Sequence, residues 1–276
     1  MGARGEAQGA RQEVVNPLES ARTYLRSQGV DEPGPDLKLL AAFAAGLPLR
    51  NALGAPPPEF TPSQESKFRR LVARRGENRE PVAYLVGTEE FMGLELRVTP
   101  SVLIPRPSTE SLVLRAGRIG TFLEIGTGSG AISIALAKDG ASGTATDVSD
   151  RAIEIARENA ERHGVLGRIT FVKADLFAPG SFDLVISNPP YVSTAEMETL
   201  PPEVKHEPRV ALDGGPDGLA VIRRIVEGAR SRAPRLLLEI APPQAAQVRE
   251  LALRSGFQSV QITRDLDGFD RVVEAS

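Results

Sequence analysis

Phe122-Leu123-Glu124-Ile125-Gly126-Thr127-Gly128-Ser129-Gly130 is the stretch of this 276-residue chain that decides the fold. Its first four residues are mainly apolar and predict a short buried strand, and residues 131–137 predict the helix that follows. The three glycines let the backbone turn tightly and approach a ligand closely. They also direct N–H groups at the start of the helix toward a carboxylate or a phosphate. The stretch therefore predicts a βα unit with a ligand-binding turn.

Strand and helix patterns continue to alternate after this unit. A helix is expected at 150–163, and strands are expected to end at 145–147 and to cover 169–175, 182–187, 235–240, 258–263 and 271–273. Repeated βα units of this kind predict a doubly wound, mostly parallel sheet with right-handed crossovers. We therefore expect an α/β, Rossmann-like domain over residues 109–276.

The preceding part of the chain has helical patterns instead, and we expect a small helical domain over residues 16–76. Three helices are predicted, and they begin at Asn16-Pro17, at Asp36 and at the capping box Thr61-Pro62-Ser63-Gln64. The last of them is expected to end at Gly76. Four arginines of that last helix fit a solvated face or a docking patch for an acidic partner: Arg69, Arg70, Arg74 and Arg75.

Residues 77–108 are expected to link the two domains. Apolar and charged residues alternate over 94–98 after a turn at Gly93, which predicts a β-hairpin. The rigid segment 102–107 is predicted to form either a lip over the site or a spacer between domains. Residues 1–15 are polar and expected to be disordered.

Composition excludes several kinds of protein. The net charge is −3, from 33 basic and 36 acidic residues, so no global basic field is present to hold nucleic acid. Cysteine is absent, and His163 and His206 are the only histidines, which argues against a zinc, iron–sulfur or histidine-rich metal centre. No apolar run is long enough to span a membrane and no signal peptide is visible, so we expect a protein of the cytoplasm. We expect a monomer because no long exposed apolar stripe is visible.

Two aspartates follow predicted strands and suggest a nucleoside-containing cofactor. Asp147 suits a bidentate grip on a ribose diol, which both NAD and S-adenosylmethionine carry. Asp175 could accept a hydrogen bond from an adenine amino group. Either residue taken alone could instead be a helix cap or a turn residue.

Residues 182–191, Phe-Asp-Leu-Val-Ile-Ser-Asn-Pro-Pro-Tyr, place Asn188 at the carboxyl end of a predicted central strand. Open α/β sheets bind their ligands at this edge. The side-chain oxygen of Asn188 and the carbonyl oxygen of Pro189 form two uncharged acceptors, which suit a planar –NH2 group. Tyr191 adds an aromatic face. The alternative is a proline-rich turn with no function beyond ending the strand.

The chemistry around Asn188 separates the two cofactors. A dehydrogenase needs a proton donor, commonly histidine or a tyrosine–lysine pair, beside its hydride acceptor. The predicted strand end offers neutral acceptors and an aromatic residue instead. This favours methyl transfer to an –NH2 nitrogen, in which the two acceptors hold the hydrogens and favour a cationic, tetrahedral transition state.

Several motifs together resemble the HemK/PrmC family, the protein-(glutamine-N5) methyltransferases of class I peptide-chain release factors. The matching segments are residues 80–84, 90–91, 102–107, 126–130, 188–191, 207–219 and Asp265-Leu266-Asp267-Gly268. The resemblance covers residues 17 to 275. It implies a methyltransferase that modifies the glutamine of a Gly-Gly-Gln loop.

The resemblance also implies roles for particular residues. S-adenosyl-L-methionine, which becomes S-adenosyl-L-homocysteine, would be held without a metal by Gly126, Thr127, Gly128, Ser129, Gly130, Asp147, Asp175, Leu176 and Asn188. Asn188, Pro189 and Tyr191 would be catalytic, and the substrate would contact Asn188, Pro189, Pro190, Tyr191 and Arg106. The helical domain would dock the release factor.

The chain departs from the family at two positions. Ser108 stands where the family commonly has glutamate, which puts a carboxylate role there in doubt, and Ala241 replaces a usual glycine. Two other functions are alternatives: an amino-group methyltransferase acting on DNA or RNA, and a non-catalytic cofactor-binding module. His206 is tempting as a general base, but a polar loop residue is the better interpretation.

Overall fold

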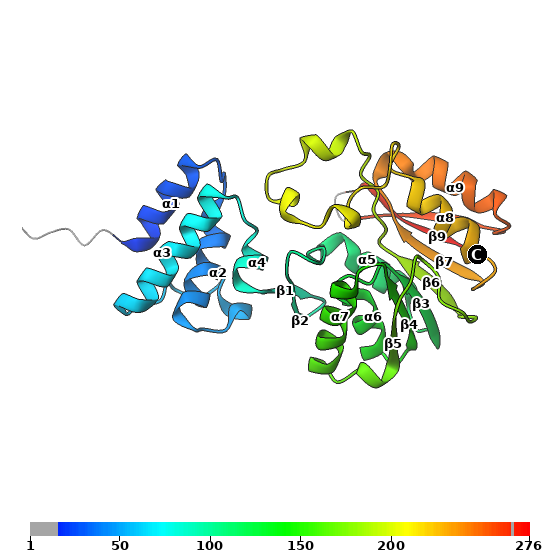
Figure 1. The fold of residues 1–276 in the computed structure, drawn as a ribbon, viewed down its shortest axis with the longest axis horizontal. Coiled ribbons are helices and arrows are strands. Elements are labelled where there is room, and N and C mark those ends of the chain that lie inside the picture. Colours follow the sequence, from blue (N-terminus) through cyan, green and yellow to red (C-terminus); the bar gives the residue numbers. More distant parts are fainter. Residues whose placement is uncertain (1–15, 266–267) are drawn as a thin grey trace, which may run out of the picture. The chain divides into compact units, whose positions relative to one another are not determined.

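The computed structural model describes residues 16–265 and 268–276, and it divides between Leu85 and Val86 into two compact units. Figure 1 shows the fold coloured along the sequence. The expected disorder of residues 1–15, and Leu266 and Asp267 of the family-like tail, lie outside the described residues. Within the described ranges, no helix combines the length and apolarity needed to cross a membrane.

The first unit contains the three expected helices. They are α1 (Pro17–Ser27), α2 (Pro33–Ala45) and α3 (Pro62–Glu77), with a short turn η1 (Leu49–Asn51) and a fourth helix, α4 (Val82–Val86), at the boundary. Asn16 caps α1 by accepting from the N–H of Leu18 at 3.0 Å. The capping box of α3 is confirmed, because the side chains and N–H groups of Thr61 and Gln64 bond reciprocally.

Two expectations for this unit are wrong. Helix α2 begins at Pro33, and Asp36 lies in its first turn instead of capping it. The carboxylate of Asp36 accepts a 2.7 Å hydrogen bond from Arg75, whose side chain is buried, so Arg75 belongs to neither a solvated face nor a patch. Arg69 and Arg74 do face solvent, where they pair with Glu65 and Glu80.

The second unit is built on a seven-stranded sheet in the order β5-β4-β3-β6-β7-β9-β8. Its strands are β3 (Thr121–Ile125), β4 (Ser142–Asp147), β5 (Ile169–Lys173), β6 (Leu184–Ser187), β7 (Arg235–Glu239), β8 (Val260–Arg264) and β9 (Asp270–Ala275). The first five in this sheet order are parallel, and β9 runs antiparallel to both β7 and β8. The predicted doubly wound α/β fold is confirmed.

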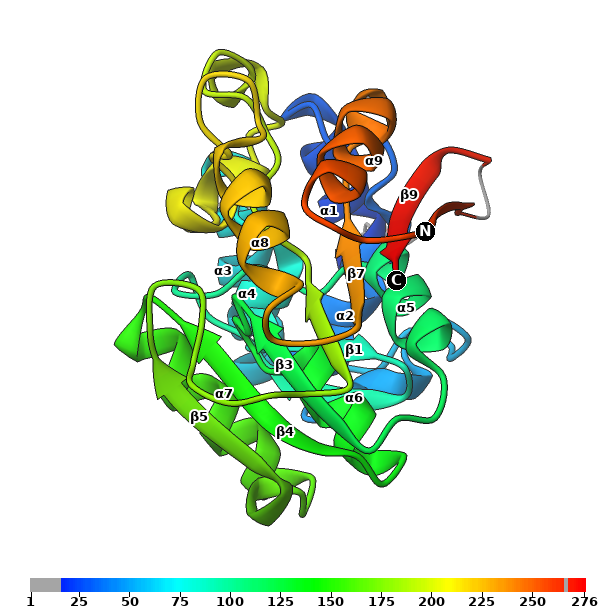
Figure 2. The same ribbon diagram turned by 90° about the vertical axis from the view of Figure 1, so that its right-hand side faces the viewer.

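Helices cover both faces of this sheet (Figures 1 and 2). One apolar core joins the sheet to α5 (Pro107–Ala116), α6 (Ala131–Lys138) and α7 (Asp150–Arg162), and the other joins it to α8 (Ala220–Ala229) and α9 (Ala245–Arg254). Neighbouring residues of β3 pack into opposite cores: Phe122 belongs to the first core and Leu123 to the second. Helices α5, α8 and α9 were not predicted from the sequence.

The predicted hairpin is formed by β1 (Thr88–Phe91) and β2 (Leu94–Arg97), which pair antiparallel around Met92 and Gly93. Both turn residues have positive φ, 50° and 75°, as a two-residue hairpin turn requires. Phe91 and Leu96 are buried in the first core of the second unit. The hairpin therefore packs as part of the sheet domain.

Candidate active site

A cavity of about 290 Å³ lies at the carboxyl ends of the central strands. Its walls include most of the residues expected at the site: Arg106, Gly126, Thr127, Gly128, Ser129, Asp147, Asp175, Leu176, Asn188, Pro189 and Pro190. Parallel strands bring these sequence-distant residues together, because their carboxyl ends meet at one edge of the sheet. Within the described part of the chain, Gly130 and Tyr191 are the two expected residues that do not line it.

The glycine turn after β3 leaves room for a ligand at two positions. Gly126 and Gly128 have φ of 74° and 55°, and a Cβ on either would meet no atom within 4 Å. Gly130 differs, because a Cβ there would lie 3.0 Å from Ile134 and 3.2 Å from Ala156. The first two glycines therefore open the cavity, and the third allows α6 and α7 to pack closely.

The buried carboxyl group of Glu124 holds the glycine turn in place through hydrogen bonds. Glu124 accepts a 2.7 Å hydrogen bond from the Thr127 hydroxyl and a 3.2 Å bond from the N–H of Ser133. Burial raises the pKa of Glu124 to about 7, against the opposing effect of these hydrogen bonds. The turn is thus fixed to the strand before it and the helix after it.

Asp147, at the end of β4, connects two turns. One carboxylate oxygen accepts from the N–H of Gly128 and the other from the N–H of Ser149, each at 2.9 Å. Burial raises its pKa. Each carboxylate oxygen has a second lone pair, so the group can still accept two hydrogen bonds from a vicinal diol.

Asp175 and Leu176 lie beyond the end of β5, which stops at Lys173 and not at Asp175 as expected. The strand ends early because the chain turns at Leu176, whose φ is 76° and whose carbonyl accepts a 2.6 Å bond from Thr146. Asp175 is exposed and pairs with Arg224 of α8 at 2.8 Å, which lowers the pKa of the Asp175 carboxyl.

Asn188 follows β6 and is oriented by two groups from other elements. Its side-chain amide donates a 2.9 Å hydrogen bond to the hydroxyl of Thr109 in α5. Thr109 in turn donates to the buried carboxylate of Glu239 on β7, at 2.7 Å. Because its nitrogen binds Thr109, the side-chain oxygen of Asn188 is the atom able to accept from a bound –NH2 group.

Tyr191 packs against the second core of the sheet domain. Burial, followed by the charge of Glu239, raises the pKa of Tyr191 to about 12. Its carbonyl accepts a 3.0 Å hydrogen bond from Gln244, whose side chain also donates to the Gly218 carbonyl at 3.1 Å. The backbone around the Asn-Pro-Pro-Tyr turn is therefore fixed by the segment 214–218.

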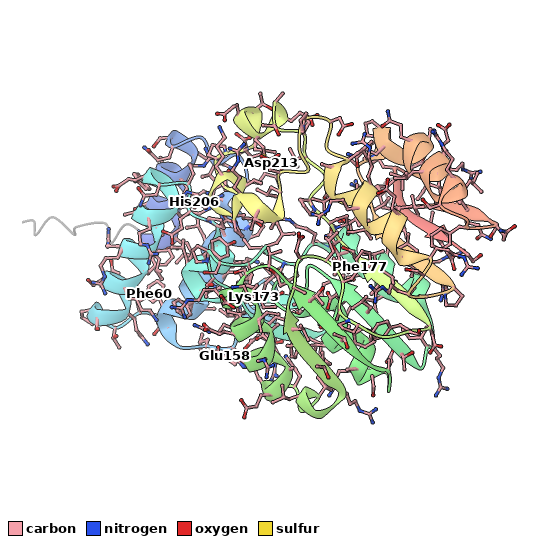
Figure 3. All side chains as sticks on the ribbon, turned by 45° about the vertical axis from the view of Figure 1, so that its right-hand side comes forward. Phe60, Glu158, Lys173, Phe177, His206 and Asp213 are labelled. Atoms are coloured by element: carbon pink, nitrogen blue, oxygen red, sulfur yellow. The ribbon has the colours of Figure 1, made fainter. Side chains whose placement is uncertain are left out.

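The segment between Tyr191 and α8 forms a loop. Its two ends meet in a short β-bridge between Val192 and Asp213. Asp213, labelled in Figure 3, accepts from the Thr194 hydroxyl at 2.8 Å and from the N–H of Gly215 at 3.0 Å. His206, also labelled there, belongs to the turn η4 (Val204–His206) within this segment and is not among the residues that line the cavity. No catalytic role is indicated for it.

The segment 102–107 contributes four residues to the cavity wall, which favours the lip over the spacer. Arg106 forms an ion pair with Glu207, whose side chain is 2% exposed. The other oxygen of Glu207 accepts from the N–H of Ile104 at 3.1 Å. This pair joins the lip to the segment that follows Tyr191.

The residues that line the cavity fit a nucleoside with an attached amino acid. Gly126 and Gly128 provide open space, and Asp147 provides acceptors for a diol. Val148, Val221 and Ile225 give apolar walls. Over the residues described, no cluster of three histidine, cysteine or acidic side chains is placed to bind a metal.

Sequence reasoning missed Thr109, Glu207, Glu239 and Gln244. Glu239 lies within the mainly apolar run 235–240, so an acidic residue in a predicted buried strand was the available signal. Its partners could not be found in the same way, because Ser108 and Thr109 are 131 and 130 residues away in sequence.

Two family models match the chain. A model described as the PrmC N-terminal domain matches residues 17–87, and one described as the methyltransferase small domain matches residues 109–210. The first match spans the helical unit and the second the cavity-forming strands.

Curated proteins with the name release factor glutamine methyltransferase are similar over nearly the whole chain. The relative from Geobacter sulfurreducens is 42% identical and covers 93% of this chain and 94% of its own length. The relative from Cereibacter sphaeroides is 40% identical, with 95% of this chain and 98% of its own length covered. The one from Rhodopirellula baltica is 38% identical, with coverages of 94% and 95%.

Solved structures share the fold at low sequence identity. A methyltransferase from Pyrococcus furiosus has a TM-score of 0.52 and 22% identity, over 67% of this chain and 89% of its own. The catalytic domain of hMettl16, solved with a hairpin of the MAT2A 3'UTR, has a TM-score of 0.57 and 17% identity, over 98% and 96%. These similarities support the α/β methyltransferase fold.

Proposed function

The chain belongs to the release factor glutamine methyltransferase family, and on that premise we propose its reaction and the roles of its residues. It transfers a methyl group from S-adenosyl-L-methionine to the side-chain amide nitrogen of the glutamine in the Gly-Gly-Gln loop of class I peptide-chain release factors. One observation carries the assignment. The amide of Asn188, oriented by Thr109, lies on the wall of the same cavity as Asp147 and the glycine turn.

The substrate end of the cavity is assigned to Asn188 and Pro189. The glutamine –NH2 group has two hydrogens, and the Asn188 side-chain oxygen and the Pro189 carbonyl oxygen are two acceptors for them. Both residues line the cavity at the end of β6. Pro190 and Arg106 line it as well and complete the proposed substrate site. The contact of Tyr191 with the substrate stays a prediction.

The cofactor end is assigned to the glycine turn, Asp147 and the Asp175–Leu176 step. When bound, S-adenosyl-L-methionine supplies a methyl group already activated on a sulfonium sulfur. The open positions at Gly126 and Gly128 admit the amino-acid part, and the Asp147 carboxylate accepts from the ribose diol. The exposed carboxylate of Asp175 can accept from the adenine amino group.

The protein accelerates the reaction mainly by positioning. Holding two reactants in line can supply up to about 7–11 kcal/mol in favourable cases. The acceptors at Asn188 and Pro189 hold both hydrogens of the amide, so its lone pair is directed toward the incoming methyl group and the positive charge that develops is stabilised. The methylated nitrogen is strongly acidic, so water can remove its proton and no general base is needed.

We assign the docking of the release factor to the helical part, residues 16–76. Its Arg69 and Arg74 are exposed and pair with Glu65 and Glu80, so an acidic partner would compete with these carboxylates for them. We also propose that the protein acts as a monomer in the cytoplasm.

Methyl transfer with labelled S-adenosyl-L-methionine tests the function. A purified class I release factor, its loop variant with Gln→Ala, DNA and RNA are offered side by side, and the Asn188→Ala chain serves as the inactive control. We expect label on the release factor only, and none on its loop variant. Label on nucleic acid alone would keep the fold and the cofactor and overturn the substrate.

A further inference from the structure

We propose that Thr109 is a positioning residue for methyl transfer, and that it relays the acceptor character of Glu239 to fix the direction of the Asn188 amide. The proposal rests on the proposed function only for its effect on turnover. The hydrogen-bond relay itself can be measured without substrate or cofactor.

Three side chains from three elements form the relay. Asn188, after β6, donates from its side-chain nitrogen to the hydroxyl oxygen of Thr109 at 2.9 Å. Thr109, in the first turn of α5, donates its hydroxyl proton to one oxygen of Glu239 on β7 at 2.7 Å. The geometry thus connects a buried charge to the residue that holds the substrate amide.

Proton counting fixes the direction of each bond. A carboxylate can only accept hydrogen bonds, and a hydroxyl has a single proton to donate. The Thr109 proton is committed to Glu239, so the Thr109 oxygen can only accept from Asn188. The –NH2 side of Asn188 must face Thr109, and its oxygen must face away from Thr109. A flipped amide would place two acceptors against each other with no proton between them.

Burial makes this arrangement strict. Thr109 is 4% exposed and Glu239 is fully buried. Little solvent reaches the bond between Thr109 and Glu239, and an unpaired polar group is costly in such a setting. Asn188 is consequently held in one of its two amide orientations before the substrate arrives.

Other groups contact the Glu239 carboxyl or carry charge near it. Ser108 donates to its second oxygen at 3.0 Å. Burial raises the pKa of this carboxyl, against the opposing effect of the hydrogen bonds from Thr109 and Ser108 and of the positive charges of Arg271 and Arg106. Tyr191 stands nearby as an uncharged phenol.

The first test compares three variants of α5 by steady-state kinetics on release factor. Thr109→Val keeps the shape and removes the hydroxyl, Thr109→Ser restores the hydroxyl, and Ser108→Ala removes a donor to the same carboxylate without touching Asn188. We expect Thr109→Val to lower kcat by about 10- to 100-fold through misplacement of the amide, with the KM for S-adenosyl-L-methionine unchanged. Thr109→Ser should recover most of kcat, and Ser108→Ala should lose far less than Thr109→Val.

Two outcomes of the kinetics overturn the proposal: a Thr109→Val enzyme with wild-type kcat, or a Thr109→Ser enzyme as impaired as Thr109→Val. Thr109→Ala replaces the valine variant if that protein does not fold. Inactivity of the unmodified chain on every release factor would count against the proposed function and not against the relay.

The second test observes the Asn188 side chain directly. In chain labelled with ¹⁵N-asparagine, the side-chain –NH2 signal of Asn188 is identified by its loss in Asn188→Asp. We expect slow hydrogen exchange in the wild-type and Thr109→Ser chains, and at least tenfold faster exchange in Thr109→Val. Equal exchange rates in the wild-type and Thr109→Val chains would show that Thr109 does not hold the amide.

Discussion

Gly218 packs against Tyr191 so closely that a Cβ atom at position 218 would lie 2.4 Å from the Tyr191 carbonyl oxygen. Gly214 makes a similar approach, with a Cβ position 2.7 Å from the carbonyl oxygen of Pro190. Gln244 binds the carbonyls of both Tyr191 and Gly218. The glycine-rich segment that follows the Asn-Pro-Pro-Tyr turn therefore acts as its backbone support.

Gly218→Ala should damage the site through this contact. The position has φ of 73°, so a side chain is strained there whatever the space, and the clash is with backbone that cannot give way. We expect a loss of about 1–3 kcal/mol in the free energy of unfolding and a larger proportional loss of kcat. Urea unfolding and methyl-transfer kinetics measure the two effects.

Gly167→Ala is the matched control for that substitution, because a Cβ at position 167 would meet nothing within 4 Å and the φ is not positive. The free energy of unfolding and the kcat of Gly167→Ala should equal those of the unmodified chain. If Gly218→Ala behaved like Gly167→Ala, the supporting role of the segment would be refuted.

Asp147→Asn should weaken cofactor binding. The amide replaces one of two accepting oxygens by a donor, which then faces either the N–H of Gly128 or that of Ser149. Hydrogen bonds to charged groups contribute about 1.5–3 kcal/mol, so the Kd for S-adenosyl-L-homocysteine should rise roughly 10- to 100-fold. Isothermal titration calorimetry gives this value, with the exposed Asp139→Asn as a control that should bind normally. Unchanged affinity in Asp147→Asn would remove this residue from the site.

The raised pKa of Glu124 predicts that the stability of the folded chain depends on pH. Its pKa is about 7 in the folded chain against an ordinary value of 4.5, so between these values the folded chain binds the proton more than the unfolded chain does. The free energy of unfolding should therefore fall as the pH rises from about 4.5 to about 7, by an amount on the order of 3 kcal/mol from this group.

Urea unfolding at pH 5 and pH 8 checks this dependence in the wild-type chain and in Glu124→Gln. The variant cannot ionise at this position, so the difference between the two pH values should shrink. A variant with the full wild-type difference would show that other groups cause it.

Asn188→Ala separates catalysis from cofactor binding. Loss of the side-chain oxygen removes one of two acceptors for the substrate amide, and loss of a single such electrostatic contact typically costs about 10²–10³ in kcat. Affinity for S-adenosyl-L-homocysteine should change little. Kinetics and calorimetry on the variant, with the exposed Gln258→Ala as control, give both numbers. A substantial residual kcat would contradict the assigned mechanism.

Much of the fold was predictable because its signals are local. The run before Gly126 reads as a strand, the glycines as a turn and Ala131 onward as a helix, and all three are confirmed. Helix α5 was missed because Pro107, which occupies its first position, looked like part of a proline-rich linker. Asp36 resembled a helix cap in sequence, but Arg75 binds its carboxylate from another helix.

The site was predictable where topology alone gathers residues. Gly126, Asp147 and Asn188 each follow a strand, and a parallel sheet brings strand ends to one edge. The supporting contacts were not predictable, because Thr109 and Glu239 meet only through the placement of α5 against β7. No local pattern records such a long-range contact.

Tandem mass spectrometry of a class I release factor after reaction tests the central claim most directly. The digest is compared with that of release factor incubated with the Asn188→Ala chain. We expect an added mass of one methylene on the glutamine of the Gly-Gly-Gln loop, located in the side-chain amide, and none with the variant. A methyl group on any other residue, or equal modification by the Asn188→Ala chain, would contradict it.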